Sequence, residues 1–335
     1  MAGNTLFSLG EALIDLVPTQ AGCSFEQVPA FAPQVGGGPA RVCAAFARLG
    51  GRSSLITQLG EDPFGHQIAR ELADRGVDLS HLTFTSAAGT ALAFSSQDPQ
   101  GIQTVHLCRK PSAELLYAPE QLDPGWFREA FALHFGSGCL VDSPMRFTHL
   151  AAIAAARQAG ALVSFAPGLR PGFWPDREML RQTVLQFAPR AHILQLSEGE
   201  PEFLTGSSDL DTALPRLLTG KLQLVVYTGS QGARAYTRRT RAAAACRDLA
   251  KLDLAHASHG FFGCFLWQLL QKGVTADKLE TLSRKALEEA LAVSNRFRLL
   301  SARRHGALAG FPTPEQLDPA APAHFLPTEG DSHGL

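Results

Sequence analysis

The chain has 335 residues, of which 45% are hydrophobic and 18% are charged, and its formal net charge is −1. That balance argues against a nucleic-acid partner and against a membrane-surface partner. No apolar run approaches the roughly 18 residues that a membrane span needs. The N-terminus, MAGNTLFSLGEALIDLVP, lacks the basic start and the small-residue cleavage site of a signal peptide. We therefore expect a soluble cytoplasmic protein.

The cysteines support a reducing compartment. They are widely scattered and form no CxxC pair, so in a chain of this length we interpret them as buried thiols. The six positions are Cys23, Cys43, Cys108, Cys139, Cys246 and Cys264.

Short apolar strands alternate with helical patterns along the chain. Residues 4–10 and 53–60 are strand-like, residues 39–50 have apolar positions at helical spacing, and residues 62–76 open with Asp-Pro and close at glycine. The later elements follow the same rhythm: strands at 132–138, 161–167, 191–197 and 222–229, and helices from about 145 to 158, from about 178, and after His259. This alternation predicts an α/β doubly wound fold with a mostly parallel sheet and helices on both faces.

Two stretches break the rhythm and predict an inserted β-lid. Residues of about 16–35 and 88–113 look like hairpin-forming strands without helices between them, and SQDPQG is a clear turn signal. We expect a single domain over residues 1–319 that carries this lid. Residues 320–335 are rich in proline and polar residues, which is typical of a frayed tail.

Several segments together resemble the ribokinase-type (PfkB) carbohydrate kinases, and within them bacterial fructokinases. They are SLGEALIDLVP, GGGPARVCAAFARLGG, TQLGEDPFGHQI, RKPSAELL, SFAPGLRPGFWPD, LSEGEPEFLTG and GALAGFPTPEQL, in the family's order and spacing. The resemblance runs from about Leu6 to Leu317 and implies a ribokinase-like core with a β-lid over a sugar. It also implies transfer of the γ-phosphate of ATP, with Mg²⁺, to a hydroxyl of fructose or a similar sugar.

The motif that carries the chemistry in this family is rewritten here. Its form is D-T-T-G-A-G-D, in which the glycines and the following helix form an anion hole and the last aspartate is the general base. In DLAHASH, Asp253 matches the first aspartate, while His256 and Ser258 stand at the glycines and Ala257 lies between them. His259 stands at the catalytic aspartate, where an imidazole could accept a proton but from a different position.

Other departures also fall on functional positions. Arg41 replaces an asparagine that contacts the sugar, and Ala166 and Gly168 replace an acid and an amide near the phosphate and metal. Larger residues stand where the family uses small ones beside the nucleotide: Arg296, Phe297 and Arg298.

The remaining motif positions are retained. By resemblance, Asp15, Gly36, Gly37 and Arg109 would contact the sugar. The nucleotide and magnesium region would include Glu200, Gly229, Gly232 and Asn295.

Three functions compete. The first is a fructokinase-like sugar kinase with activity strongly reduced or lost, because the anion-hole glycines and the catalytic aspartate are replaced. The second is a non-catalytic or engineered small-molecule-binding protein. Its pocket would use Arg41, His106, His256, His259 and Phe297. The third is a metal site on His256 and His259, with His106, Cys108 and Cys264 as further ligands if the fold gathers them.

Each of these functional interpretations has a purely structural alternative. The two histidines can simply pack at a helix start, Arg41 can be a solvated cation rather than an anion-binding fork, and Phe297 can fill the core. We expect no nucleic-acid or membrane partner. The resemblance implies a homodimer through lid strands.

Overall fold

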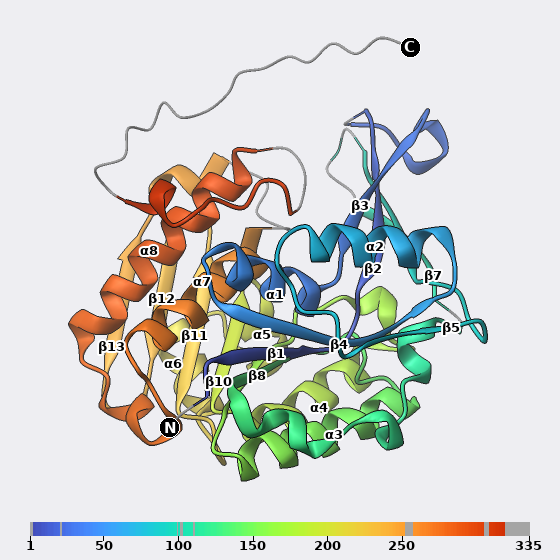
Figure 1. Cartoon of the computed structure of the whole chain (residues 1–335). Helices are drawn as coiled ribbons and strands as arrows, with labels where there is room; N and C mark the ends of the chain where they lie inside the picture. The colour runs from blue at the N-terminus through green and yellow to red at the C-terminus, as the bar shows by residue number, and fades with distance from the viewer. Residues whose placement is uncertain are drawn as a thin grey trace.

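The computed structural model describes residues 3–20, 22–98, 100, 103–109, 111–251, 257–304 and 308–318. His256 and Asp253, and the predicted tail, lie outside these residues. Two sheets organise the described chain (Figure 1). The strands are β1 (Thr5–Leu9), β2 (Leu13–Pro18), β3 (Phe31–Gly36), β4 (Arg52–Gly60), β5 (Leu82–Thr85), β6 (Leu92–Gln97), β7 (Gln103–Cys108), β8 (Ala130–Gly136), β9 (Leu162–Ala166), β10 (Ile193–Ser197), β11 (Leu224–Gly229), β12 (Gly232–Tyr236) and β13 (Arg241–Ala245).

The larger sheet has nine strands in the order β13-β12-β11-β10-β9-β8-β1-β4-β5. Its strands from β11 to β5 are parallel, whereas β12 and β13 form an antiparallel hairpin at one edge. The predicted doubly wound, mostly parallel sheet is therefore confirmed.

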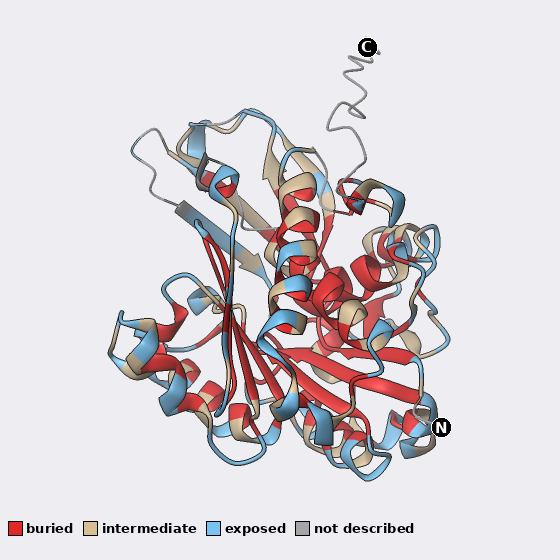
Figure 2. Ribbon diagram, turned by 90° about the vertical axis from the view of Figure 1, so that its left-hand side faces the viewer, coloured by how far each residue is buried: buried red, intermediate tan, exposed pale blue. Residues whose placement is uncertain are grey.

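Helices cover both faces of this sheet. They are α1 (Gly38–Arg48), α2 (Pro63–Ala73), α3 (Pro144–Gln158), α4 (Arg177–Phe187), α5 (Glu200–Thr205), α6 (Leu210–Leu217), α7 (Ala257–Gln271) and α8 (Arg284–Ala302). One buried cluster joins the sheet to α3, α4, α5 and α6, and a second joins it to α1, α7 and α8. Figure 2 shows buried residues concentrated in the central strands and on the helix faces turned toward them.

The smaller sheet has the strand order β3-β2-β6-β7. The pairs β2–β3 and β6–β7 are antiparallel, as the two hairpin-like stretches predict, and β2 runs parallel to β6. This sheet extends away from the central sheet in Figure 1 and stands above the ends of its parallel strands. We call it the lid sheet.

None of the helices in the described residues is long and apolar enough to cross a membrane.

Candidate active site

The loops that follow the parallel strands meet at one edge of the central sheet, because the carboxyl ends of parallel strands point the same way. Each loop brings positions that the sequence singles out. They are Ala166 and Gly168 after β9, Glu200 after β10, and Gly229 at the end of β11. The start of α1 and the start of α7 face the same edge, since Gly38 and His259 lie against each other.

Arg41 and Asp15 form a buried ion pair. Arg41 Nη2 donates to Asp15 Oδ2 at 2.7 Å, and Arg41 is 0% exposed. Within the described residues, Arg41 Nε and Nη1 have no hydrogen-bond partner. The interpretation of Arg41 as a solvated cation is therefore wrong. One of its donors engages the carboxylate predicted to hold the sugar.

Two glycines bring the backbone close to this pair. A Cβ on Gly36 would lie 2.4 Å from Asp15 Oδ2, and a Cβ on Gly37 would lie 2.2 Å from the carbonyl oxygen of Glu11. Gly37 has a φ of +96°, which non-glycine residues rarely adopt, and it caps α1. The sequence predicts close approach at these positions, and the geometry accounts for both glycines.

Arg109 lies at the base of the lid sheet, just after β7. Its Nε donates to Glu114 Oε1 at 2.7 Å and its Nη1 donates to the carbonyl of Gly138 at 2.8 Å. The guanidinium also stacks 4.6 Å from the centre of the Phe173 ring. Arg109 is thus held by the protein on several sides and is only 5% exposed.

The site includes acidic and basic residues that the sequence patterns did not single out. Glu11 lies buried at the end of β1, where Gly38 N donates to its Oε1 at 3.3 Å, and burial raises its pKa. Arg170 Nη1 lies 3.7 Å from Asp15 Oδ1. Arg170 could have been found from the quoted segment SFAPGLRP, because it keeps the arginine of the family pattern.

His259 lies in the first turn of α7, which begins at Ala257. The sequence predicts a helix from Gly260 with the histidine in the preceding turn, whereas α7 already includes Ala257, three residues earlier. A Cβ on Gly38 would lie 2.9 Å from His259 Cε1, and one on Gly168 would lie 3.5 Å from the same atom. The imidazole therefore packs against the first residue of α1 and against a glycine of the loop after β9.

Arg298 bridges the end of β11 and the start of α7. Its Nη1 donates to the carbonyl of Gly229 at 2.9 Å and its Nη2 donates to Ser258 Oγ at 3.2 Å. It is only 3% exposed. Burial lowers the pKa of Arg298 to about 10. A buried cation thus lies between the nucleotide-loop glycine and the predicted anion-hole serine.

The neighbours of Arg298 on α8 serve the core. Phe297 is 0% exposed and contacts the Phe311 ring at a centroid distance of 5.4 Å. It also fills the space in front of Gly260, whose Cβ would lie 2.8 Å from it. Asn295 Nδ2 donates to the carbonyl of Ala244 at 2.8 Å. The interpretation of Phe297 as core filling is confirmed.

Glu200 opens α5 and is held by the backbone. Its Oε1 accepts from Leu169 N and its Oε2 from Ser197 N, both at 2.7 Å. Burial raises the pKa of Glu200 to about 7 in spite of these two donors. Ala166, at the end of β9, contributes no side-chain oxygen to this region.

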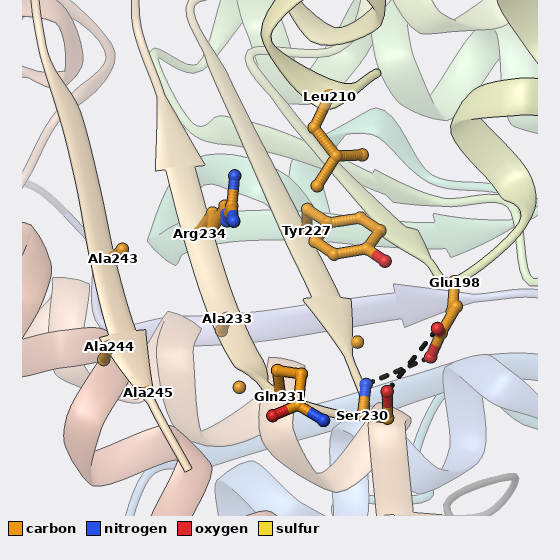
Figure 3. A pocket seen from close by; sticks show the side chains of 12 residues that line it. Glu198, Leu210, Tyr227, Ser230, Gln231, Ala233, Arg234, Ala243, Ala244 and Ala245 are labelled. Carbon is orange, nitrogen blue, oxygen red and sulfur yellow. Dashed lines mark hydrogen bonds between the residues drawn. The ribbon is translucent and has the colours of Figure 1, made fainter. Parts of the chain in front are cut away.

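A cavity of about 320 Å³ lies on the strands β11, β12 and β13 (Figure 3). Gly229 and Gly232 line it, and Glu198 accepts from Ser230 N at 3.0 Å at its rim. Gly232 has a φ of +125°. Tyr227 and Arg234 lie over this cavity in Figure 3, whereas Arg298 contacts the same loop from the α8 side.

The predicted metal site gains no support. Among the described residues, no group of three or more histidine, cysteine or acidic side chains is arranged to hold a metal ion. Cys264 is buried on α7 and His106 is exposed on β7. His256 lies outside the described residues.

The fold and the loop positions define a sugar-kinase scaffold, and the comparison with known families agrees. The profile of the pfkB family carbohydrate kinases matches residues 4–314, so the chain belongs to this family. Fructokinase-1 of Oryza sativa subsp. japonica is 37% identical, over 93% of this chain and 97% of that protein. Fructokinase-1 of Zea mays is 36% identical, over 91% and 94%.

Solved structures agree in fold. Fructokinase with bound ATP from Xylella fastidiosa superposes with a TM-score of 0.84 at 28% identity, over 93% of this chain and 96% of that chain. Fructokinase from Vibrio cholerae O395 in a fructose-, ADP- and calcium-bound form gives a TM-score of 0.81 at 28% identity, over 94% and 97%. The predicted ribokinase-like fold and the fructokinase resemblance are confirmed.

Proposed function

We propose that this chain is a sugar kinase of the fructokinase lineage whose phosphoryl-transfer activity is strongly reduced or lost. The lineage activity is ATP-dependent phosphorylation of fructose or a related sugar. The observation that carries the proposal is the buried bridge that Arg298 makes between Gly229 and Ser258.

The bridge obstructs the predicted phosphate path. By resemblance, the phosphates of ATP lie between the loop after β11 and the start of α7, and small residues border that path. A guanidinium hydrogen-bonded to both elements occupies the space between them. Because glycines lack a side chain, they let backbone N–H groups approach a phosphate, and Ser258 does not offer that access.

The position of the base is changed as well. We assign the catalytic position to His259, with Ala257, Ser258 and His256 at the anion-hole positions. The imidazole of His259 packs closely against Gly38 and Gly168. The positions of its two ring nitrogens are therefore set by this packing. Since a misplacement of about 1 Å can cost roughly a hundredfold in rate, we expect a poor base even at a favourable pH.

The acidic residues do not fit Mg²⁺ well. Hard divalent cations prefer carboxylate and carbonyl oxygens. Both oxygens of Glu200 already accept backbone hydrogen bonds, and Ala166 offers no carboxylate. We infer weak binding of ATP and Mg²⁺, although Gly229, Gly232 and Asn295 keep the nucleotide-side pattern. On the sugar side we assign Asp15, Gly36, Gly37, Arg41 and Arg109. The homodimer and the cytoplasmic location remain predictions.

The test is ADP release from ATP–Mg²⁺ with fructose and a panel of related sugars at high enzyme concentration. Sugar kinases of this type are expected to turn over at about 1–100 s⁻¹. We expect a rate at least about a thousandfold lower, given the combined loss of base and anion hole. Sugar-dependent release within the ordinary range would overturn the proposal.

Two variants locate the defect. His259→Asp returns the family's base, and the double variant His259→Asp/Arg298→Gly also opens the phosphate path. We expect a larger gain from the double variant than from either single change, because base and path act in one step. Arg296→Gly, a neighbour on α8 whose Nε donates to the carbonyl of Gln316, is the matched control.

A further inference from the structure

Charges of both signs surround Asp15 at the base of the lid sheet. The described residues there provide three guanidinium groups and three carboxylates: Arg41, Arg109, Arg170, Glu11, Asp15 and Glu114. All three carboxylates are buried, with exposures of 7% or less. With asparagine in place of Arg41, the same set would carry an excess of one negative charge.

Arg41 changes what the carboxylate of Asp15 can offer a ligand. Its Nη2 lies 2.7 Å from Asp15 Oδ2, and the guanidinium is completely buried. A completely buried side chain does not reach a ligand directly. Its effect is to neutralise Asp15 and to occupy an oxygen that would otherwise accept a sugar hydroxyl.

Arg109 is occupied in a similar way. Its guanidinium donates hydrogen bonds to Glu114 and to the carbonyl of Gly138, and its flat face stacks on the Phe173 ring. It therefore adds little to the charge that a ligand meets.

Arg170 is the charged group of this set with access to solvent. Its side chain is 35% exposed, and its Nη1 lies 3.7 Å from Asp15 Oδ1, beyond the distance of a normal hydrogen bond. Its guanidinium lies 5.7 Å from the centre of the Phe173 ring, a contact that helps to hold the group beside Asp15. A ligand entering from solvent thus meets a positive group in front of carboxylates that are buried and paired.

We propose that the site around Asp15 and Arg170 binds a small polyol that carries an anionic group, in preference to a neutral sugar. Arg170 contacts the anion through its planar fork, and Arg41 is a positioning residue that removes the repulsion of Asp15. The polyol part of this ligand rests on the proposed function. The anionic part rests on the charges described here.

Equilibrium binding without nucleotide tests the proposal separately from catalysis. Isothermal titration of the wild-type chain uses three probes: gluconate as a carboxylate, fructose 6-phosphate as a phosphate, and fructose. We expect at least one anionic probe to bind about tenfold or more tighter than fructose, and its affinity to fall with added salt. The two anionic probes distinguish a sugar acid from a sugar phosphate.

Substitutions test which residues cause the preference for an anionic ligand. Arg170→Gln should abolish the preference for the anionic probe, whereas Arg181→Gln, an arginine of similar exposure (37%) on α4, should leave it unchanged. Arg41→Asn should reverse the preference toward fructose. The exposed Arg170 keeps the proposal testable if the buried substitution at Arg41 prevents folding. Circular dichroism of each variant reports folding.

The outcomes are decisive in each direction. Fructose binding as tightly as both anions, no binding of any probe, or an anion preference that survives Arg170→Gln would overturn the proposal. A kinase rate in the ordinary range would overturn the proposed loss of activity without affecting this result, because the titration contains no ATP.

Discussion

The imidazole of His259 occupies the space that any side chain at Gly38 would need. A Cβ built on Gly38 would lie 2.9 Å from His259 Cε1, closer than Cβ contacts found in proteins. Two positions 221 residues apart, on α1 and α7, thus fit each other. The rewritten catalytic position is packed into its surroundings.

This fit predicts that Gly38→Ala is costly only while His259 is present. Overpacking costs typically about 1–3 kcal/mol, and replacing the ring by the shorter aspartate side chain should relieve it. We expect a coupling free energy of about 1 kcal/mol or more between Gly38→Ala and His259→Asp, measured by urea unfolding in a double-mutant cycle. Gly89→Ala, whose Cβ would have a single ordinary contact at 3.6 Å, is the control. Equal costs in both backgrounds would show that the fit does not matter.

The contact between Gly38 and His259 illustrates which features of the fold sequence patterns predict and which they do not. Local periodicity and turn residues correctly predict most strands of the central sheet and the helices α1, α2, α3 and α4, because apolar spacing and capping act within a few residues. They do not indicate the short elements β5, α5 and α6, the β12–β13 hairpin or α8. The start of α7 was placed one turn late, because His259 is an unusual residue for a helix start.

Contacts between distant segments account for the rest. Arg298 reaches Ser258 and Gly229 from 40 and 69 residues away, and Arg41 reaches Asp15 from 26 residues away. Resemblance marks these arginines as departures from the family. Only the fold shows that each arginine engages a position assigned to a ligand.

Arg298 yields a prediction about nucleotide affinity. If its guanidinium obstructs the phosphate path, Arg298→Gly should raise the affinity for ADP by about tenfold, equivalent to about 1.4 kcal/mol. Titration with a fluorescent ADP analogue measures this, with Arg296→Gly as the control. A lower affinity in Arg298→Gly would instead identify the guanidinium as a phosphate ligand.

The buried pair of Arg109 and Glu114 predicts a strong effect on stability. Glu114→Ala leaves a cation unpaired at 5% exposure, and breaking such a pair costs about 3–5 kcal/mol. Replacing both partners, as in Arg109→Met/Glu114→Leu, should cost less than Glu114→Ala alone. Urea unfolding measures both variants.

A surface pair provides the comparison for this prediction. Lys272 and Glu289 lie 3.0 Å apart, with side chains 31% and 50% exposed. Glu289→Ala should cost no more than about 1 kcal/mol, since exposed ion pairs contribute little. A similar cost for Glu114→Ala and Glu289→Ala would contradict the assignment of Arg109–Glu114 as a strong buried pair.

Buried histidines predict that the fold loses stability in mild acid. Burial lowers the pKa of His134 to about 3 and those of His149 and His192 to about 4. In the unfolded chain these groups take up protons below a pKa of about 6.5, while in the folded chain they stay neutral. Their contribution is therefore present above about pH 6.5 and decreases as the pH falls toward 4.

Two buried carboxyl groups oppose this trend. Burial raises the pKa of Glu200 to about 7 and also raises that of Glu11, so both favour the folded state as the pH falls through this window. Each group changes the free energy of unfolding by at most about 1.4 kcal/mol per pH unit. Because the three histidines outnumber the two carboxyl groups, we expect a net loss of stability as the pH falls below about 6.5.

Urea unfolding at several pH values, in the wild type and two variants, checks this balance. His149→Gln removes one group of the first kind and should flatten the loss of stability in acid. Glu200→Gln removes one group of the second kind and should steepen it. The opposite signs distinguish titration from simple packing damage, because a packing defect shifts the free energy of unfolding equally at every pH. If both variants run parallel to the wild type, these side chains do not govern the acid sensitivity.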